Sequence, residues 1–405
     1  MPQLASKYNC TGCMGCHDRC PKEAISIRYG CDGHRYVDVD TSLCVECGLC
    51  EKVCPVVNGR EYGSDTIESH FLAGWSNDKE IRMRGATSGV FGSMAKSVLT
   101  SGGAVIGTRM DGLECKYCVI NKLEDLGRLQ GSKYVSSNPA GTYKAVENLL
   151  LMGKKVLFCG LPCHVAACLS YINPILKEQL TTVDLVCGGV SSPKLLDIFC
   201  DNTPGFKEVI SFRDKRNGWN PKGYRYNFRY LNQDGSCIDS HDEKKNLVTD
   251  GFACELTDRY SCYRCQFAKI HRESDITIGD LWGDTKFKEE HREGVSLIIV
   301  HSEKGLECLR ESDVTLQKIE GLDSLKHNRR TFYGKSIKRF FPERLFLGYF
   351  INHFSYAILK RIYAGDLKTK NILWWPFALW RLCSFRLASE IIRNRSNRIL
   401  KKVFR

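Results

Sequence analysis

The chain has 405 residues, which is long for one hydrophobic core and predicts two or three domains. Its 43% hydrophobic and 26% charged residues are ordinary for a globular protein. The longest uninterrupted apolar stretch, residues 372–380, is about half of the ~18 residues that a membrane-spanning helix needs. Residues 1–9 contain no apolar run, so we expect no signal peptide.

The 22 cysteines and the net charge of +13 are both unevenly distributed. Because the cysteines fall in C-x-x-C groups and no export signal is expected, they favour metal or cluster binding in a reducing cytoplasm over a disulfide framework. Residues 336–405 hold fifteen Lys or Arg against three Asp or Glu, which is nearly the whole positive excess. We therefore expect a cytoplasmic protein with a basic tail.

Eight cysteines near the N-terminus form two runs of the pattern C-x-x-C-x-x-C-x-x-x-C-P, and the second run repeats the first 34 residues later. In this bacterial ferredoxin pattern the last cysteine of each run binds the cluster of the other run. Residues 1–62 are thus predicted to form a ferredoxin-type domain with two [4Fe–4S] clusters. One cluster is assigned to Cys10, Cys13, Cys16 and Cys54, and the second to Cys44, Cys47, Cys50 and Cys20.

Two alternating segments between the runs, 24–27 and 36–39, predict a pair of short strands that turns at 30–33. The alternative to clusters is a zinc-binding or disulfide knot. Zinc sites close with four ligands per ion and do not require two interleaved runs that each end in proline. Cys31 fits neither run and is predicted to be a bystander.

From about residue 71 to 333, apolar runs alternate with helical segments, which predicts an α/β or α+β sheet domain. Buried strands are expected at 104–108, 156–159, 183–187, 276–278 and 295–301, and helices at 89–100, 140–152 and 162–171. Residues 224–230 alternate at period two, which predicts an edge strand or a hairpin arm.

Two segments of this domain suit an anion or a cofactor. The Ser/Gly-rich turn 85–89 precedes an apolar helix and offers backbone N–H groups to an anion, although most such turns are plain caps. Lys133 and Tyr134 are a basic–aromatic pair that would suit the side of a flavin or a phosphate, but the pair is equally consistent with ordinary surface residues. No G-x-G-x-x-G, complete P-loop, Ser-His-Asp set or H-E-x-x-H occurs. Nothing in the sequence selects among three candidate proton donors, His164, Asp280 and Asp284, and Asp280 is expected rather to brace the turn 279–283.

Four further cysteines could converge on one more cluster. Cys163 follows a predicted strand, Cys187 ends another, and Cys262 and Cys265 form a C-x-x-C loop. Spacing alone supports a third cluster and simple core packing equally, because cysteines are among the most buried residue types. Five other cysteines of the domain are expected only to pack: Cys159, Cys168, Cys200, Cys254 and Cys308.

Four motifs follow one another in this domain: GLPCH at 160–164, DLVCGGVSSP at 184–193, SCYRC at 261–265 and SDITIGDLWG at 274–283. In this order they resemble the beta-subunit family of the coenzyme F-420 (deazaflavin) hydrogenases and dehydrogenases. The likeness extends over residues 1 to about 340, and ferredoxin-dependent reductases of the chlorophyll pathway share the plan.

The resemblance implies a ferredoxin domain fused to an α/β domain, at 70–335, that binds FAD and a third [4Fe–4S] cluster. The cysteines that match the family motif are Cys163, Cys187, Cys262 and Cys265. The resemblance also places Ser88, Gly89, Lys133 and Tyr134 near the flavin.

Two positions depart from the family pattern. The family usually has a second glycine where Val90 stands, which could alter the turn near the flavin. It often has a histidine where Gly188 stands, which could remove a polar group beside the cluster or the substrate. The resemblance therefore does not identify the substrate.

The tail, residues 336–405, interleaves basic and bulky apolar side chains and predicts amphipathic helices. Such helices suit the surface of an anionic membrane, here its inner face, slightly better than they suit docking of a partner protein. Nucleic acid is not expected, since no binding motif accompanies the basic residues.

The sequence thus predicts an iron–sulfur, flavin-dependent oxidoreductase. Clusters would exchange single electrons with FAD, which would exchange a hydride with a small-molecule substrate. The alternative is an electron-transfer subunit that feeds a separate catalytic partner and has no substrate of its own. Either function requires a redox partner protein, which would be a ferredoxin or a catalytic subunit.

Overall fold

The computed structural model describes residues 1–58, 70–219, 227–239, 246–255, 257–283 and 286–320, together with residues 332, 356, 357 and 359. The predicted amphipathic helices of the tail lie almost wholly outside these residues, as do residues 224–226 and Asp284. Of the tail, Tyr356 and Leu359 pack against a hydrophobic cluster of the second domain.

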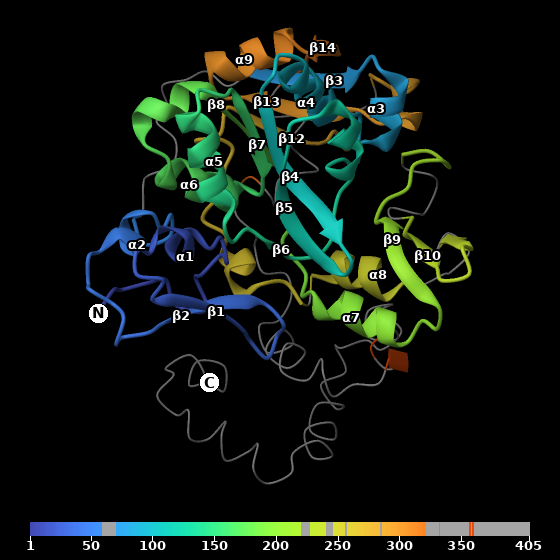
Figure 1. The fold of residues 1–405 in the computed structure, drawn as a ribbon. Coiled ribbons are helices and arrows are strands. Elements are labelled where there is room, and N and C mark those ends of the chain that lie inside the picture. Colours follow the sequence, from blue (N-terminus) through green and yellow to red (C-terminus); the bar gives the residue numbers. More distant parts are fainter. Residues whose placement is uncertain are drawn as a thin grey trace, which may run out of the picture.

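The N-terminal domain has the strand pair that the sequence predicts. Strands β1 (Ile25–Tyr29) and β2 (Arg35–Val39) are antiparallel, with Ile25 opposite Val39. Each cysteine run leads into a short helix, α1 (Gly15–Arg19) or α2 (Leu49–Lys52). This domain lies against one end of the second domain, below α5 and α6 in the view of Figure 1.

The second domain is built on a mixed sheet of nine strands. Its central strands β12, β8, β7 and β4 are parallel, and antiparallel strands flank them on both sides. Across the sheet the strands are β14 (Val314–Lys318), β3 (His70–Ser76), β13 (Ser296–Val300), β12 (Ile276–Asp280), β8 (Leu180–Leu185), β7 (Val156–Gly160), β4 (Ala104–Asp111), β5 (Glu114–Ile120) and β6 (Ser137–Asn138).

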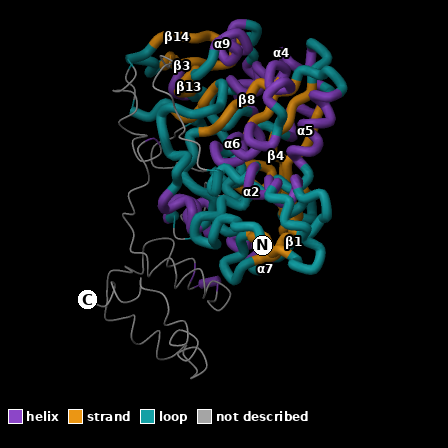
Figure 2. Tube along the Cα trace, turned by 90° about the vertical axis from the view of Figure 1, so that its left-hand side faces the viewer, coloured by secondary structure: helices purple, strands orange, loops and turns teal. Residues whose placement is uncertain are grey.

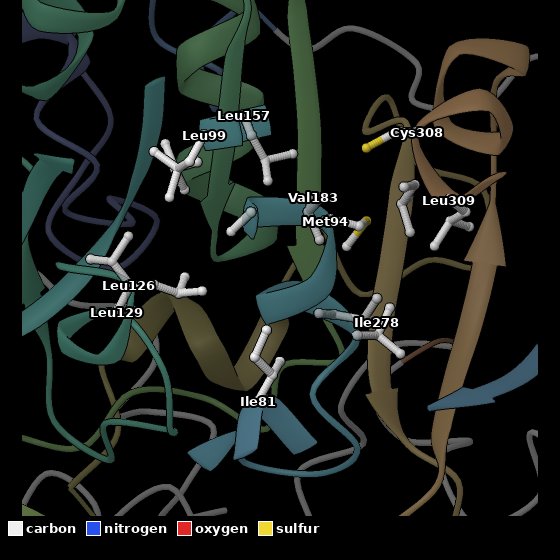
Figure 3. Packing of buried hydrophobic residues seen from close by; sticks show 14 of the residues in the cluster. Ile81, Met94, Leu99, Leu126, Leu129, Leu157, Val183, Ile278, Cys308 and Leu309 are labelled. Atoms are coloured by element: carbon white, nitrogen blue, oxygen red, sulfur yellow. The ribbon is translucent and has the colours of Figure 1, made fainter. Parts of the chain in front are cut away.

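Helices cover both faces of this sheet, which makes three layers (Figure 2). The two hydrophobic clusters divide along β7, where Leu157 faces one layer and Val156 and Phe158 face the other. The first layer contains α4 (Val90–Thr100), α9 (Glu303–Arg310) and the 3₁₀ turn η1 (Leu123–Arg128), and the second contains α5 (Thr142–Leu151) and α6 (Pro162–Tyr171). Figure 3 shows Met94 and Leu99 of α4 in the first layer, close to Leu157 and Val183 of the sheet.

The strands and helices predicted from apolar periodicity are confirmed, with ends that shift by a few residues. Further elements complete the domain: α3 (Lys79–Arg84), α7 (Lys194–Asp201), α8 (Leu247–Cys254), the 3₁₀ turns η2 (Pro174–Gln179), η4 (Tyr260–Arg264) and η5 (Glu290–Arg292), and a small sheet of β9 (Phe206–Ser211), β10 (Arg229–Asn232) and β11 (Cys237–Asp239). None of the helices within the described ranges is long and apolar enough to cross a bilayer.

Of the segment 224–230 the structure describes residues 227–230, and the last two of these belong to β10. This strand forms a hairpin with β11, as one of the two predictions had it. It is not an edge strand, because β9 pairs with its other side.

A buried carboxylate fastens the N-terminal domain to the second domain. Asp18 of α1 accepts hydrogen bonds from the backbone N–H groups of Gly141, at 2.7 Å, and Tyr143, at 3.2 Å. These two groups begin α5, so Asp18 caps a helix of the other domain and places its charge at the positive end of that helix. The Tyr143 hydroxyl in turn donates to the Cys13 carbonyl oxygen at 2.9 Å.

Replacing Asp18 with alanine is expected to lower the free energy of unfolding by about 1–2 kcal/mol, because two N–H groups at the start of α5, that of Tyr143 buried, lose their acceptor. Urea unfolding of anaerobic protein measures the change. Asp38→Ala is the matched control, since this carboxylate is 54% exposed and pairs with Arg28, itself 49% exposed. Its effect is expected to stay within about 0.5 kcal/mol; equal losses in both variants would contradict the capping role of Asp18.

Candidate functional site

Four cysteines of the second domain meet at the carboxyl ends of its parallel strands. Cys163 lies in the first turn of α6, directly after β7, and Cys187 follows β8 by two residues. Because β7 and β8 are parallel neighbours, their carboxyl ends lie at the same edge of the sheet. Cys262 lies in η4 and Cys265 follows it, so a separate loop brings two more thiols to the same place.

These four thiols line one cavity of about 660 Å³ and are called the inner group: Cys163, Cys187, Cys262 and Cys265. Burial raises the pKa of Cys163 well above that of an ordinary thiol, and the nearby thiols of Cys265, Cys187 and Cys262 add to this rise. The structure therefore brings together the four cysteines that the sequence left open between a cluster and simple packing. Their role as ligands stays a prediction.

The N-terminal cysteines fall into two groups that match the crossed assignment. In the middle group, Cys10, Cys13, Cys16 and Cys54, burial raises the pKa of Cys16 strongly, and the other three thiols raise it further. In the outer group, Cys20, Cys44, Cys47 and Cys50, all four line one cavity of about 370 Å³. Cys47 is exposed, whereas Cys13 and Cys54 are buried, so the outer group is the one that reaches the surface.

The middle group lies next to the inner group. Thr11 and Gly12, from the loop between Cys10 and Cys13, line the cavity of the inner group. The thiol of Cys13 also contributes to the raised pKa of Cys163. The outer, middle and inner groups are therefore arranged in series from the surface toward the second domain. In the part of the chain that the structure describes, no three His, Cys, Asp or Glu side chains are placed to hold a single metal ion.

A cleft of about 2070 Å³ lies beside the inner group and contains all four residues predicted near the flavin. The cleft and the cavity of the inner group share Cys187, Leu161 and Gly189 in their walls. Nine glycines line the cleft and leave backbone, rather than side chains, facing its interior: Gly85, Gly89, Gly92, Gly107, Gly131, Gly160, Gly188, Gly189 and Gly279.

The turn 85–89 is held rigidly at one wall of this cleft. Ser88 is fully buried, and its hydroxyl donates to the Gly74 carbonyl oxygen at 2.8 Å and contacts the Ser296 hydroxyl at 2.6 Å. The side chain of Ser88 thus fixes the turn to β3 and β13. The ammonium group of the buried Lys215 donates to the carbonyl oxygens of Arg82, Thr87 and Glu293 and ties the turn to two other segments.

The backbone of this turn suits an anionic group. Gly89 caps α4 with a φ of 79° and provides no side-chain acceptor for the first N–H groups of the helix. Val90, Phe91 and Gly92, which carry these N–H groups, line the cleft. A phosphate at this point would meet uncapped donors and the positive end of the helix dipole. The residues present therefore suit a phosphate or another anionic group.

Lys133 and Tyr134 also line the cleft, and both side chains contact neighbouring residues. The Lys133 ammonium donates to the carbonyl oxygens of Leu129 and Gln130, both at 3.0 Å, and burial lowers its pKa to about 8. The Tyr134 ring stacks on Phe252 with centroids 4.2 Å apart. Lys133 thus contributes a cationic group to the cleft wall, and Tyr134 contributes an aromatic ring.

The two described proton-donor candidates are both held by neighbours. Burial, with a smaller contribution from Arg259, lowers the pKa of His164 to about 3, and its Nδ1 lies 2.8 Å from the Tyr117 hydroxyl. Asp280 forms an ion pair with Arg213 at 2.8 Å and accepts a hydrogen bond from the Thr87 hydroxyl. Asp280 thus connects separate segments of the cleft wall, and its predicted role as a brace of the turn 279–283 stays a prediction.

Sequence reasoning missed Tyr117, Arg213 and Trp282 as members of the cleft wall. Arg213 lies over the rings of Trp219 and Trp282, at 5.3 and 5.4 Å, and these two rings stack 4.6 Å apart. Trp282 lies in the quoted motif 274–283, which is the one signal that pointed to this corner.

Two family models match parts of this chain, and known proteins resemble it. Residues 153–320 match the family model for the C-terminal part of the coenzyme F420 hydrogenase/dehydrogenase beta subunit, and residues 9–58 match the model for a 4Fe-4S dicluster domain. The coenzyme F420-dependent sulfite reductase of Methanocaldococcus jannaschii is 27% identical over 351 residues, which are 82% of this chain and 50% of that protein. A subunit of the F(420)H(2) dehydrogenase of Methanosarcina mazei is 23% identical over 189 residues, which are 44% of this chain and 53% of that protein.

The chain thus spans about half the length of the curated relatives that it matches. Among solved structures, a chain of the F420-reducing [NiFe] hydrogenase complex from Methanosarcina barkeri aligns with a TM-score of 0.46 and 17% identity over 66% of this chain and 89% of that one. Over residues 153–320 this chain is thus similar to the C-terminal part of the coenzyme F420 hydrogenase/dehydrogenase beta subunit, and over residues 9–58 it matches a 4Fe-4S dicluster domain, so it is an iron–sulfur protein related to oxidoreductases.

Proposed function

We propose that this protein is an iron–sulfur flavoprotein oxidoreductase that transfers electrons between a redox partner protein and a small substrate. The outer, middle and inner groups would each hold one [4Fe–4S] cluster, and the large cleft would hold FAD. When bound, FAD exchanges two electrons with a hydride donor or acceptor and single electrons with a cluster. In this proposal residues 1–62 and 70–335 are the two functional domains.

One observation carries the proposal: Cys187 lies in the wall shared by the cavity of the inner group and the large cleft. A cluster on the inner group would therefore be adjacent to a cofactor in the cleft. On the other side, Thr11 and Gly12 bring the loop of the middle group to the same cavity. The chain's own residues thus provide a continuous path from an exposed thiol, Cys47, to the cleft.

The residues of the cleft supply binding and shielding. Uncapped N–H groups at the start of α4 would bind the diphosphate, and Tyr134 and Trp282 would limit access of water to the ring. The ammonium of Lys133 would place a positive charge near a reduced ring. The two curated relatives are named for coenzyme F420, so we propose a deazaflavin coenzyme as the first substrate to test.

The test is anaerobic mixing of the purified protein with reduced deazaflavin coenzyme, and separately with NADH. We expect the reduced deazaflavin to bleach the visible absorbance of the clusters in the wild-type protein. Bleaching by NADH but not by reduced deazaflavin would contradict a deazaflavin substrate and indicate a nicotinamide instead. Bleaching by neither, in protein that contains both cofactors, would favour an electron-transfer subunit without a substrate of its own.

Gly89→Ala is expected to weaken FAD binding by about tenfold or more while leaving the iron content unchanged. A Cβ at this position would lie 2.7 Å from the Cα of Arg82, so the turn 85–89 must move. Gly102→Ala is the matched control: its φ of 80° imposes the same backbone strain at the other end of α4, but its Cβ would meet open space. Fluorescence titration of apoprotein with FAD compares the two. Equal weakening would contradict the role of the turn.

A further inference from the structure

The contact between the two domains contains a buried arginine beside the middle group. Arg259 precedes η4 and is among the largest fully buried side chains. Its guanidinium donates to the Cys10 carbonyl oxygen at 3.2 Å and also to the Arg35 carbonyl oxygen. The Tyr36 ring covers it, 4.7 Å from the guanidinium carbon.

The fit around this guanidinium is close. A Cβ on Gly12 would lie 2.4 Å from one of its nitrogens, so the loop between Cys10 and Cys13 passes directly over it. Gly12 also has a φ of 71°, which a residue with a Cβ would rarely adopt. The middle-group loop therefore requires glycine here in order to rest on the arginine.

The same residue is fixed to the inner group through its backbone. The N–H of Arg259 donates to the Val190 carbonyl oxygen at 3.1 Å, and its carbonyl oxygen accepts from the N–H of Cys262 at 2.9 Å. Arg259 thus binds a middle-group loop with its side chain and an inner-group turn with its main chain. This geometry fixes the distance between the two groups.

The charge of Arg259 is not cancelled locally. Within the described part of the chain no carboxylate forms an ion pair with the guanidinium, and its Nε has no hydrogen-bond acceptor. A guanidinium stays protonated in proteins, and a buried charge acts more strongly than one in water because little solvent screens it. A [4Fe–4S] cluster gains one negative charge on reduction, and its potential depends on the nearby charge and hydrogen bonds.

We propose that Arg259 is a positioning residue that raises the reduction potential of the cluster on Cys10, Cys13, Cys16 and Cys54. An electron in the series of three clusters would then reside preferentially on this middle cluster. The step is the addition of one electron from a one-electron donor, with no proton taken up, since the guanidinium keeps its proton throughout. This inference rests on the proposed function, because it requires a cluster in the middle group.

The test is a redox titration of the whole chain, purified anaerobically, with dithionite as the reductant and electron paramagnetic resonance as the readout. We expect Arg259→Gln to lower the reduced-to-oxidised ratio of the middle cluster at a given potential by tenfold or more, which is about 59 mV for one electron. Arg264→Gln is the matched control. It removes the same charge from the same turn, but this side chain is exposed and its effect should be screened.

Arg259→Lys keeps the charge and is expected to keep the ratio within about threefold of wild type. If Arg259→Gln does not bind iron, Arg259→Lys provides the test instead. A tenfold drop in its reduced-to-oxidised ratio, in a chain with full iron content, would contradict the proposal. Equal potentials in wild type and Arg259→Gln, with full iron content, would overturn the role of Arg259 alone. Absence of cluster signals from the wild type would instead overturn the proposed function.

Discussion

Cys163→Ala is expected to remove one four-iron cluster, so that the iron content falls from about twelve to about eight atoms per chain. Three thiols of the inner group would remain, and three thiolates do not complete a cluster that needs four. Because the inner group separates the middle group from the cleft, the variant should also lose reduction of the clusters by a substrate bound in the cleft. Iron analysis and the anaerobic bleaching assay measure the two effects.

Cys168→Ala provides the control on the same helix. Cys168 is fully buried in the hydrophobic cluster between α5, α6 and the sheet, where it packs against residues such as Val165 and Phe158. Its loss should leave all twelve or so irons in place and cost only stability, about 1 kcal/mol. Full iron content in Cys163→Ala, or equal loss in both variants, would contradict the assignment of the inner group.

Cys20→Ala is expected to abolish the outer cluster and leave the middle one intact, although Cys20 belongs to the same sequence run as Cys10, Cys13 and Cys16. The crossed pairing predicts this, since Cys20 shares a cavity with Cys44, Cys47 and Cys50. Electron transfer from a protein partner should then slow strongly, because none of the cysteines of the two remaining groups is exposed. Stopped-flow reduction by a reduced ferredoxin measures this rate.

A double variant distinguishes crossed from uncrossed pairing. With crossed pairing, Cys20→Ala combined with Cys44→Ala removes one cluster and leaves about eight irons, as the single variant does. With uncrossed pairing the same double variant would damage both N-terminal clusters and leave about four. Cys31→Ala, which removes an exposed thiol of the same domain, should leave the iron content unchanged.

The local sequence pattern predicted the strands and helices of this fold well where burial of apolar side chains dominates. The buried central strands β7 and β13 are nearly continuous apolar runs, because both of their faces are covered. Strands β5 and β14 carry several half-exposed polar residues and were not predicted, since their pattern resembles that of a loop. Their place in the sheet is set by antiparallel pairing with β4 and β3, which a single sequence does not reveal.

The residues of the candidate site were likewise predicted in part and missed in part. Spacing alone predicted the N-terminal ligand sets, because the cysteine pattern itself encodes the crossed arrangement. The meeting of Cys163 and Cys187 followed from two parallel strand ends, but only the resemblance favoured Cys262 and Cys265 as their partners. Asp18 and Arg259 were missed, because their partners lie more than a hundred residues away along the chain. Nothing in the local sequence marks either residue as a bridge between domains.

The chemical composition of anaerobically purified protein tests the central claim most directly. Iron, acid-labile sulfide and FAD would be measured on the same sample, with a visible spectrum. The three cysteine groups and the cleft predict about twelve irons, as many sulfides and one FAD per chain. About eight irons and no flavin would contradict the account, since the inner group would then hold no cluster and the cleft no FAD.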